Sequence, residues 1–192
     1  MTPHPEHPIY TIGYGNRTVD ELVAILQQYG IHYLIDVRSS PYSRFKPEFG
    51  KEALDQALRP HSIRYVFLGQ ELGGRPTDPD CFVEGKVDYD RVRAKPFYQA
   101  GIERVHTAWQ KQLPVVLMCS ELRPQECHRA KLIGETLADL GLPVQHIDEN
   151  GQLKPHAEVI AELTSGQLSL FGTQMFTSRK RYEGNEQPPG NE

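Results

Sequence analysis

A stretch of thirteen residues, "LMCSELRPQECHR" (117–129), contains two cysteines, two glutamates, a histidine and two arginines. Residues of these types support three different roles. Thiolates and imidazole bind zinc, a thiolate with an acid or base beside it acts as a nucleophile, and a buried cysteine can simply pack. The spacing of the residues decides how well each role fits.

Zinc could bind Cys119, Cys127 and His128, with Asp36 or Glu121 as a fourth ligand. Structural zinc sites usually pair their ligands roughly two to four residues apart in both halves. Here eight positions separate the two cysteines. Neighbouring residues on a helix also point about 100° apart, so Cys127 and His128 would diverge. We therefore expect no cofactor and keep zinc at these three residues as an alternative.

Either cysteine could instead be a nucleophile. Cys127 opens a predicted helix, and the positive end of a helix lowers the pKa of a thiol. Cys119 ends a predicted strand and has Glu121 and His128 near it in sequence as acid or base. Both cysteines could equally be inert, because cysteine is among the residues most often buried. The sequence alone does not show which cysteine is reactive, or whether either of them is.

Short apolar segments alternate with amphipathic ones over about the first 150 residues. The pattern predicts five strands, at 9–13, 31–37, 63–68, 114–119 and 143–147, and helices at 19–30, 51–60, 98–112 and 127–141. A last helix is expected over 155–166. Strands separated by helices imply parallel pairing through crossover connections. The expected fold is therefore a single α/β domain with a mainly parallel five-stranded sheet flanked by helices, in Rossmann-like or rhodanese-like layers.

The segments rich in chemistry each follow a predicted strand: "GYGNR", "DVRSSPYSR", "GQELGGR" and "CSELRPQECHR". Ligands of parallel sheets bind beyond the carboxyl ends of the strands, so these segments should meet at one rim. The candidate catalytic residues are Asp36, Cys119, Glu121 and His128. The candidates for binding an anion or substrate are Tyr14, Arg38, Ser43, Arg75 and Arg129. Asp36 and Arg38 could equally form a fixed pair that orients the site.

Four motifs, "TIGYG", "DVRSSPYSRF", "LGQELGG" and "LMCSELRPQECHRAKLIGETL", occur in this order. Together they resemble the bacterial and archaeal family called domain of unknown function 488, over about residues 9–148. The resemblance implies an α/β domain and no particular reaction. The residues at its motif positions are Asp36, Arg38, Cys119, Glu121, Cys127, His128 and Arg129. A fainter similarity to rhodanese-like domains concerns the fold alone.

The C-terminal region carries a second motif, "QLSLF", formed by Gln167, Leu168, Ser169, Leu170 and Phe171. It resembles the peptide by which bacterial replication and repair proteins bind the DNA sliding clamp. Apolar residues in a polar tail gain little unless they fill a pocket on a partner or fold back on their own domain. We expect an α/β domain over 1–165 and a flexible, disordered tail over 166–192.

Composition narrows the class of protein. Three cysteines without framework spacing and the absence of a signal segment favour a cytoplasmic protein with reduced thiols, and no apolar run reaches the roughly 20 residues that span a bilayer. The net charge of -4 argues against coating nucleic acid with the whole surface. The leading hypothesis is an enzyme associated with DNA repair or replication that acts on nucleic acid or a phosphorylated small molecule. The alternatives are a small-molecule thiol enzyme with rhodanese-like sulfur or acyl chemistry, and a metal-stabilised binding module.

Overall fold

The computed structural model of the chain describes residues 7–164 and 176–182. The strands are β1 (Ile9–Gly13), β2 (Tyr33–Asp36), β3 (Arg64–Phe67), β4 (Phe82–Val83), β5 (Lys86–Val87), β6 (Val115–Cys119), β7 (Val144–Ile147) and β8 (Leu153–Pro155). The α-helices are α1 (Val19–Gln28), α2 (Lys51–Leu58), α3 (Gly69–Leu72), α4 (Tyr89–Arg93), α5 (Pro96–Gln110), α6 (Glu135–Asp139) and α7 (His156–Leu163). Short 3-10 helices lie at Pro47–Phe49, Arg59–His61, Pro79–Cys81 and Pro124–Glu126 (η4), and Arg129–Gly134 (η5) is a π-helix.

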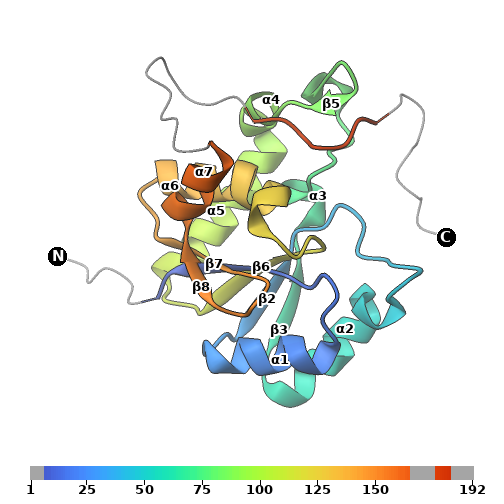
Figure 1. The fold of residues 1–192 in the computed structure, drawn as a ribbon, viewed down its shortest axis with the longest axis vertical. Helices are drawn as coiled ribbons and strands as arrows, with labels where there is room; N and C mark the ends of the chain where they lie inside the picture. Colours follow the sequence, from blue (N-terminus) through green and yellow to red (C-terminus); the bar gives the residue numbers. More distant parts are fainter. Residues whose placement is uncertain (1–6, 165–175, 183–192) are drawn as a thin grey trace.

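The main sheet has six strands in the order β3-β2-β6-β1-β7-β8 (Figure 1). The first five are parallel to one another, and β8 pairs antiparallel with β7. All five predicted strands form, so the α/β prediction is confirmed. The sixth strand is not predicted because three residues ending in proline carry no strand pattern. Pro155 is tolerated there because an edge strand does not need every N–H donor.

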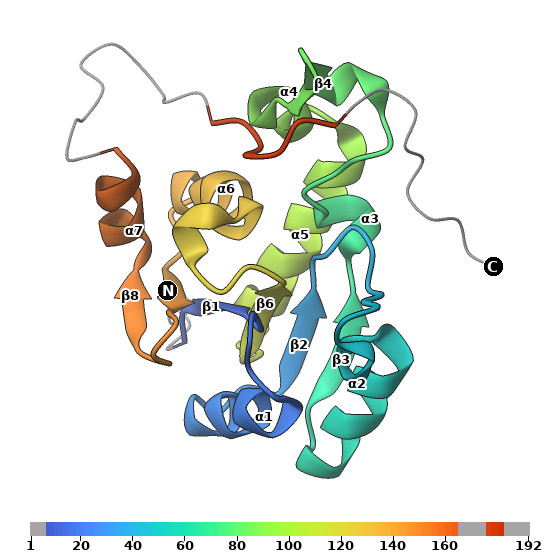
Figure 2. The same ribbon diagram turned by 45° about the vertical axis from the view of Figure 1, so that its right-hand side comes forward.

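Helices cover both faces of this sheet, with α1 and α2 on one side and α5 and α6 on the other (Figure 2). The central strand β6 alternates between the two layers. Val116 and Met118 pack with α1 and α2, whereas Leu117 and Cys119 pack with α5 and α6. Successive side chains of a strand point to opposite faces, so this register places Cys119 on the side where η5 and α6 lie.

The carboxyl ends of β1, β2 and β6 lie side by side. Gly13 is the partner of Cys119, and Asp36 is the partner of Met118. The segment after β6 crosses the end of β1 closely, and a Cβ atom on Gly13 would lie 1.7 Å from the carbonyl oxygen of Glu121. Glycine at this position therefore lets two of the chemistry-rich segments come together, as the rim prediction requires.

Residues Phe176–Tyr182, named the C-terminal strap below, run along the small hairpin of β4 and β5 (Figure 1). The sequence predicts a disordered tail over 166–192, whereas the backbone of this described segment hydrogen-bonds to the hairpin. The ordered conformation of the strap could not be predicted from the sequence, because its hydrogen-bond partners lie about ninety positions earlier in the chain. One example is the hydrogen bond between Ser178 and Val87. The predicted clamp peptide, 167–171, lies outside the described residues. Among the helices of the described part, none is long and apolar enough to cross a bilayer.

Candidate active site

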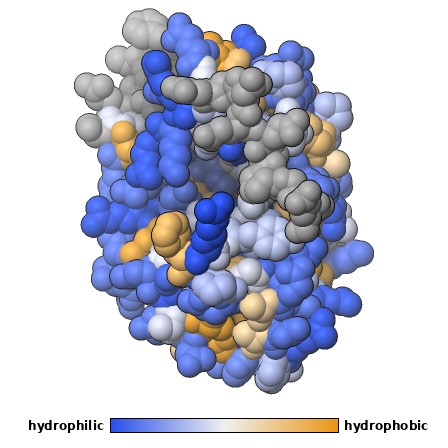
Figure 3. All heavy atoms as spheres, turned by 90° about the vertical axis from the view of Figure 1, so that its right-hand side faces the viewer, coloured by the Kyte–Doolittle hydropathy of each residue, from blue (hydrophilic) through white to orange (hydrophobic). Residues whose placement is uncertain are grey.

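A pocket of about 270 Å³ opens where β1, β2 and β6 end. Its wall comes from six parts of the chain: Tyr14, the segment 38–43, the pair Gly74 and Arg75, Tyr89, the segment 119–128 and the strap. Figure 3 shows a face of the molecule that is hollowed near its centre. The predicted rim therefore exists, and it forms a concave site.

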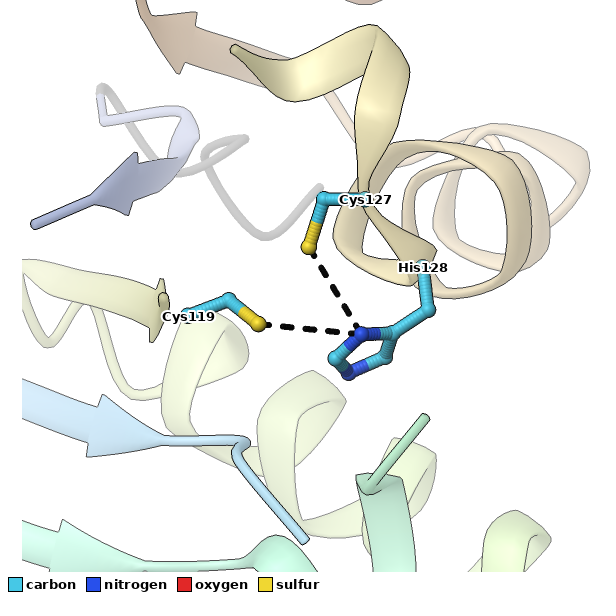
Figure 4. Close-up of side chains that lie close together, drawn as sticks. All are labelled: Cys119, Cys127 and His128. Atoms are coloured by element: carbon cyan, nitrogen blue, oxygen red, sulfur yellow. Dashed lines mark hydrogen bonds between the residues drawn. The ribbon is translucent and has the colours of Figure 1, made fainter. Parts of the chain in front are cut away.

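Cys119, Cys127 and His128 meet at the wall of this pocket (Figure 4). The Nδ1 atom of His128 lies 3.7 Å from the Sγ of Cys119 and 3.6 Å from the Sγ of Cys127. All three ligand atoms lie within 4.8 Å of one another. The Nε2 atom of His128 lies 3.1 Å from the carbonyl oxygen of Val37. A proton on Nε2 satisfies that carbonyl, which leaves the lone pair of Nδ1 facing the two sulfur atoms.

The conformation of Cys127 explains how these residues converge. Cys127 is extended, with φ -119° and ψ 149°, and the helical turns begin only after it. The helical turns therefore begin one residue after the predicted start, and the Cys127 carbonyl accepts hydrogen bonds from the N–H groups of Ala130 and Lys131. Because Cys127 is not itself helical, the argument that its side chain diverges from that of His128 does not apply. A glycine completes the arrangement, because a Cβ on Gly74 would lie 2.7 Å from Nδ1 of His128.

The four ionisable groups at this wall shift one another's pKa. Burial raises the pKa of Cys127, but the hydrogen bond with Cys119 and the charge of His128 outweigh it and hold the thiol well below its usual range. The hydrogen bond with Cys127 and burial raise the pKa of Cys119. Burial lowers the pKa of His128, but the Cys127 thiolate raises it further. These shifts favour an ion pair of a Cys127 thiolate and a protonated His128, whereas the Nδ1 lone pair faces the two sulfur atoms in the neutral imidazole.

Glu121 lies next to these thiols. Its Oε2 atom accepts a hydrogen bond from the Cys119 thiol at 3.0 Å. Burial by itself raises the pKa of Glu121, but this hydrogen bond and the charge of His128 lower it to about 2. The carboxylate is thus ionised, lines the pocket and faces the cysteine and histidine pair.

Asp36 and Arg38 form a buried ion pair behind the pocket. The Asp36 carboxylate is fully buried and accepts hydrogen bonds from Arg38 at 2.5 Å and from the Tyr65 hydroxyl at 2.6 Å. Asp36 does not line the pocket, and its oxygens are occupied. The predicted catalytic role of Asp36 is therefore not supported, and its contacts fit a positioning role for Arg38. Arg38 lines the pocket, and its Nη1 atom is buried without a hydrogen-bond partner in the described part of the chain.

Arg129 also differs from its prediction. Its side chain is fully buried, and its guanidinium donates to the carbonyl oxygens of Glu121 and Leu122. It is not among the residues that line the pocket. The geometry therefore does not support anion binding by Arg129, which instead fixes the segment that carries Glu121.

Three predicted anion-binding residues, Tyr14, Ser43 and Arg75, do line the pocket. The Arg38 guanidinium lies 5.2 Å from the centre of the Tyr14 ring. Sequence reasoning missed the residues that the strap contributes to the pocket, which are Ser178, Arg179, Lys180 and Tyr182. No spacing pattern links them to the rim, so only the tertiary structure reveals them.

Comparison with known proteins gives one match. The family model described as Domain of unknown function DUF488 matches residues 18–135, which is 118 of the 192 residues. No curated protein and no solved structure matches the chain. The matched part contains the cysteines and histidine of the pocket, whereas the strap lies beyond it. More than half of the chain is matched, and the protein therefore belongs to the DUF488 family.

Proposed function

We propose that the pocket is the active site of a zinc-dependent hydrolase that acts on an anionic substrate. The observation that carries this proposal is the convergence of Cys119, Cys127 and His128 on one point of the pocket wall, with the Glu121 carboxylate beside them. Three protein ligands next to open space are typical of catalytic zinc sites, whereas structural sites are usually closed by four.

The spacing of the three side chains suits this ion. Zn–S bonds of about 2.3 Å and Zn–N bonds of about 2.0–2.1 Å in a tetrahedral site place sulfur and nitrogen about 3.6 Å apart. The two observed separations are 3.6 and 3.7 Å. Metal-binding histidines usually donate their other N–H to a carbonyl or carboxylate, as His128 does to Val37. The residues present therefore fit the ion.

The chain itself supplies the remaining parts of a hydrolytic site. When bound, zinc supplies a Lewis acid that lowers the pKa of a coordinated water to about 7. Glu121 lies where it could accept a proton from water in the pocket. Arg38 lines the pocket with a cation that could attract an anionic substrate, and its buried Nη1 atom has no hydrogen-bond partner among the described residues. Asp36 keeps that guanidinium in place.

Glu121→Gln is expected to lower hydrolysis by about a hundredfold or more, because the amide cannot accept the proton. The assay would use p-nitrophenyl phosphate and bis-p-nitrophenyl phosphate with zinc-loaded full-length protein, and elemental analysis would give the zinc content. The variant should keep its zinc. Glu149→Gln is the control, since Glu149 pairs with Arg123 outside the pocket. Full activity in Glu121→Gln, or full activity of wild type without zinc, would contradict the proposal.

A thiol-dependent enzyme is the second candidate, and the low pKa of Cys127 beside His128 favours it. In that case the Cys127 thiolate attacks the phosphorus of the ester, the nitrophenolate leaves, and water hydrolyses the thiophosphate intermediate to release phosphate and the thiolate. Arg38 lies in the same pocket as a cation for the anionic group. The same assay separates the two candidates. Activity that survives chelation and disappears on alkylation with iodoacetamide would select the thiol enzyme.

We also propose that the enzyme works on or near DNA, bound to the sliding clamp through residues 167–171. The support is the match of all five residues to the clamp-binding pattern. Exposed aromatic side chains on the loop that borders the pocket agree with this setting. Tyr42 is 59% exposed and Phe45 is 96% exposed, and aromatic faces of this kind stack on bases.

Replacement of both Leu170 and Phe171 by alanine is expected to abolish retention on purified, immobilised sliding clamp. The physical reason is that these side chains would fill an apolar groove on the clamp. Met175→Ala is the matched control, because it removes an apolar side chain from the same region outside the pentapeptide. Failure of the intact protein to bind the clamp would remove this part of the proposal and leave the zinc site untouched.

A further inference from the structure

The C-terminal strap is anchored to the β4–β5 hairpin by backbone hydrogen bonds at both of its ends. Ser178 donates its N–H to the Val87 carbonyl at 2.9 Å, and its hydroxyl accepts from the Val87 N–H at 2.9 Å. Tyr182 donates its N–H to the Gly85 carbonyl at 2.6 Å. The residues between these anchors therefore have a defined position along one wall of the pocket.

The strap brings positive charge to this wall. Arg179 and Lys180 line the pocket, and the ring of Tyr182 lies 4.6 Å from the Arg75 guanidinium. Arg179 is 3.4 Å from Glu126, but both side chains are substantially exposed, so this ion pair contributes little and leaves Arg179 available to a ligand. The strap thus adds two cations and orients a third.

Arg38 faces the same pocket from the end of β2. It is 5% exposed, and its Nη2 and Nε atoms donate hydrogen bonds to Asp36. Its Nη1 atom is itself buried and has no hydrogen-bond partner among the residues that the structure describes. A buried N–H without an acceptor is costly, and an oxygen atom of a ligand would satisfy it. A carboxylate could be bound by Arg38 alone, whereas a phosphate group offers oxygens to several cations at once.

We propose that the strap and Arg38 together form a binding site for the phosphate group of a phosphate ester. This inference rests on the proposed function of the pocket, and it assigns Arg179 and Lys180 as residues that select the substrate. Because the family match ends at residue 135, the strap supplies selectivity from outside the matched part.

The test compares two variants of the full-length chain. Arg179 and Lys180 are both replaced by glutamine in one, which removes two positive charges. The control is Arg181→Gln, which removes one positive charge from an exposed strap residue that does not line the pocket. Calorimetric titration with phenyl phosphate should show about tenfold weaker binding for the double variant and unchanged binding for the control. Benzoate, a carboxylate of similar shape, should bind wild type more weakly than phenyl phosphate does.

Each titration is run with and without added zinc, and the melting temperature of each variant is recorded. Equal affinities in the three proteins, absence of phenyl phosphate binding to wild type, or tighter binding of benzoate would overturn the inference. If wild type holds no zinc but its phosphate affinity still depends on Arg179 and Lys180, the zinc proposal fails and the strap inference stands. If wild type holds zinc but the double variant binds phenyl phosphate as tightly as wild type does, the strap inference fails and the zinc proposal stands.

Discussion

Asp36→Asn is expected to lower the free energy of unfolding by about 3–5 kcal/mol, because it leaves the Arg38 guanidinium buried without its counter-charge. Asp36 is fully buried and Arg38 is 5% exposed, so water cannot replace the lost carboxylate. The change would also weaken the acceptor of the Tyr65 hydroxyl, which lies 2.6 Å from Oδ2. The free energy of unfolding of a typical protein is about 5–15 kcal/mol, so this loss is a large fraction of the total stability. Chemical denaturation gives the measurement.

The chain offers a matched control for this prediction. Asp55 and Arg59 form a pair with the same 2.5 Å separation, but their side chains are 31% and 71% exposed. Asp55→Asn should therefore cost at most about 1 kcal/mol. Equal effects of the two substitutions would contradict the role assigned to burial. Loss of activity in Asp36→Asn without loss of stability would restore Asp36 as a catalytic candidate.

The position of the site follows from the sequence because it depends on strand order and strand polarity. Five apolar strands alternate with helices, and the parallel pairing that results brings the segments after β1, β2 and β6 to one edge. Cys119 reaches the pocket because it ends β6, and Glu121 because it follows two residues later. Arg38 reaches the pocket because it lies two residues after Asp36, which ends β2 and binds the Arg38 guanidinium.

Three features could not be predicted because each depends on tertiary contacts. Helical spacing after Cys127 suggests that the helix begins there, but the extended backbone of this one residue turns its thiol toward His128. Arg129 resembles an anion-binding residue until its guanidinium is seen on two backbone carbonyls. The strap has no periodic apolar pattern. Its hydrogen bonds to the β4–β5 hairpin and the packing of Phe176 and Tyr182 on the core hold it in place. Polar contacts over long sequence distances leave no periodic signal.

The largest effect on ligand binding is expected from the candidate zinc ligands. Cys119→Ser, Cys127→Ser and His128→Gln should each weaken zinc binding by more than about 100-fold, since loss of even an outer partner of a ligand can cost about 10–100-fold. Competition with a chromophoric chelator measures the affinity. Cys81→Ser is the control, because Cys81 is equally buried in the same apolar cluster but does not belong to the group of ligand atoms.

Replacing zinc by cobalt tests spectroscopically whether Cys119 and Cys127 are metal ligands. Cobalt bound to thiolates gives a sulfur-to-metal charge-transfer band, so wild type and Cys81→Ser should show it fully. Cys119→Ser and Cys127→Ser should each show a weaker band, because each removes one of the two sulfur atoms near Nδ1 of His128. If only one of these two serine variants weakens the band, the second thiol is not a ligand. That result would favour a single reactive cysteine, and the low pKa of Cys127 makes it the residue to test as the nucleophile.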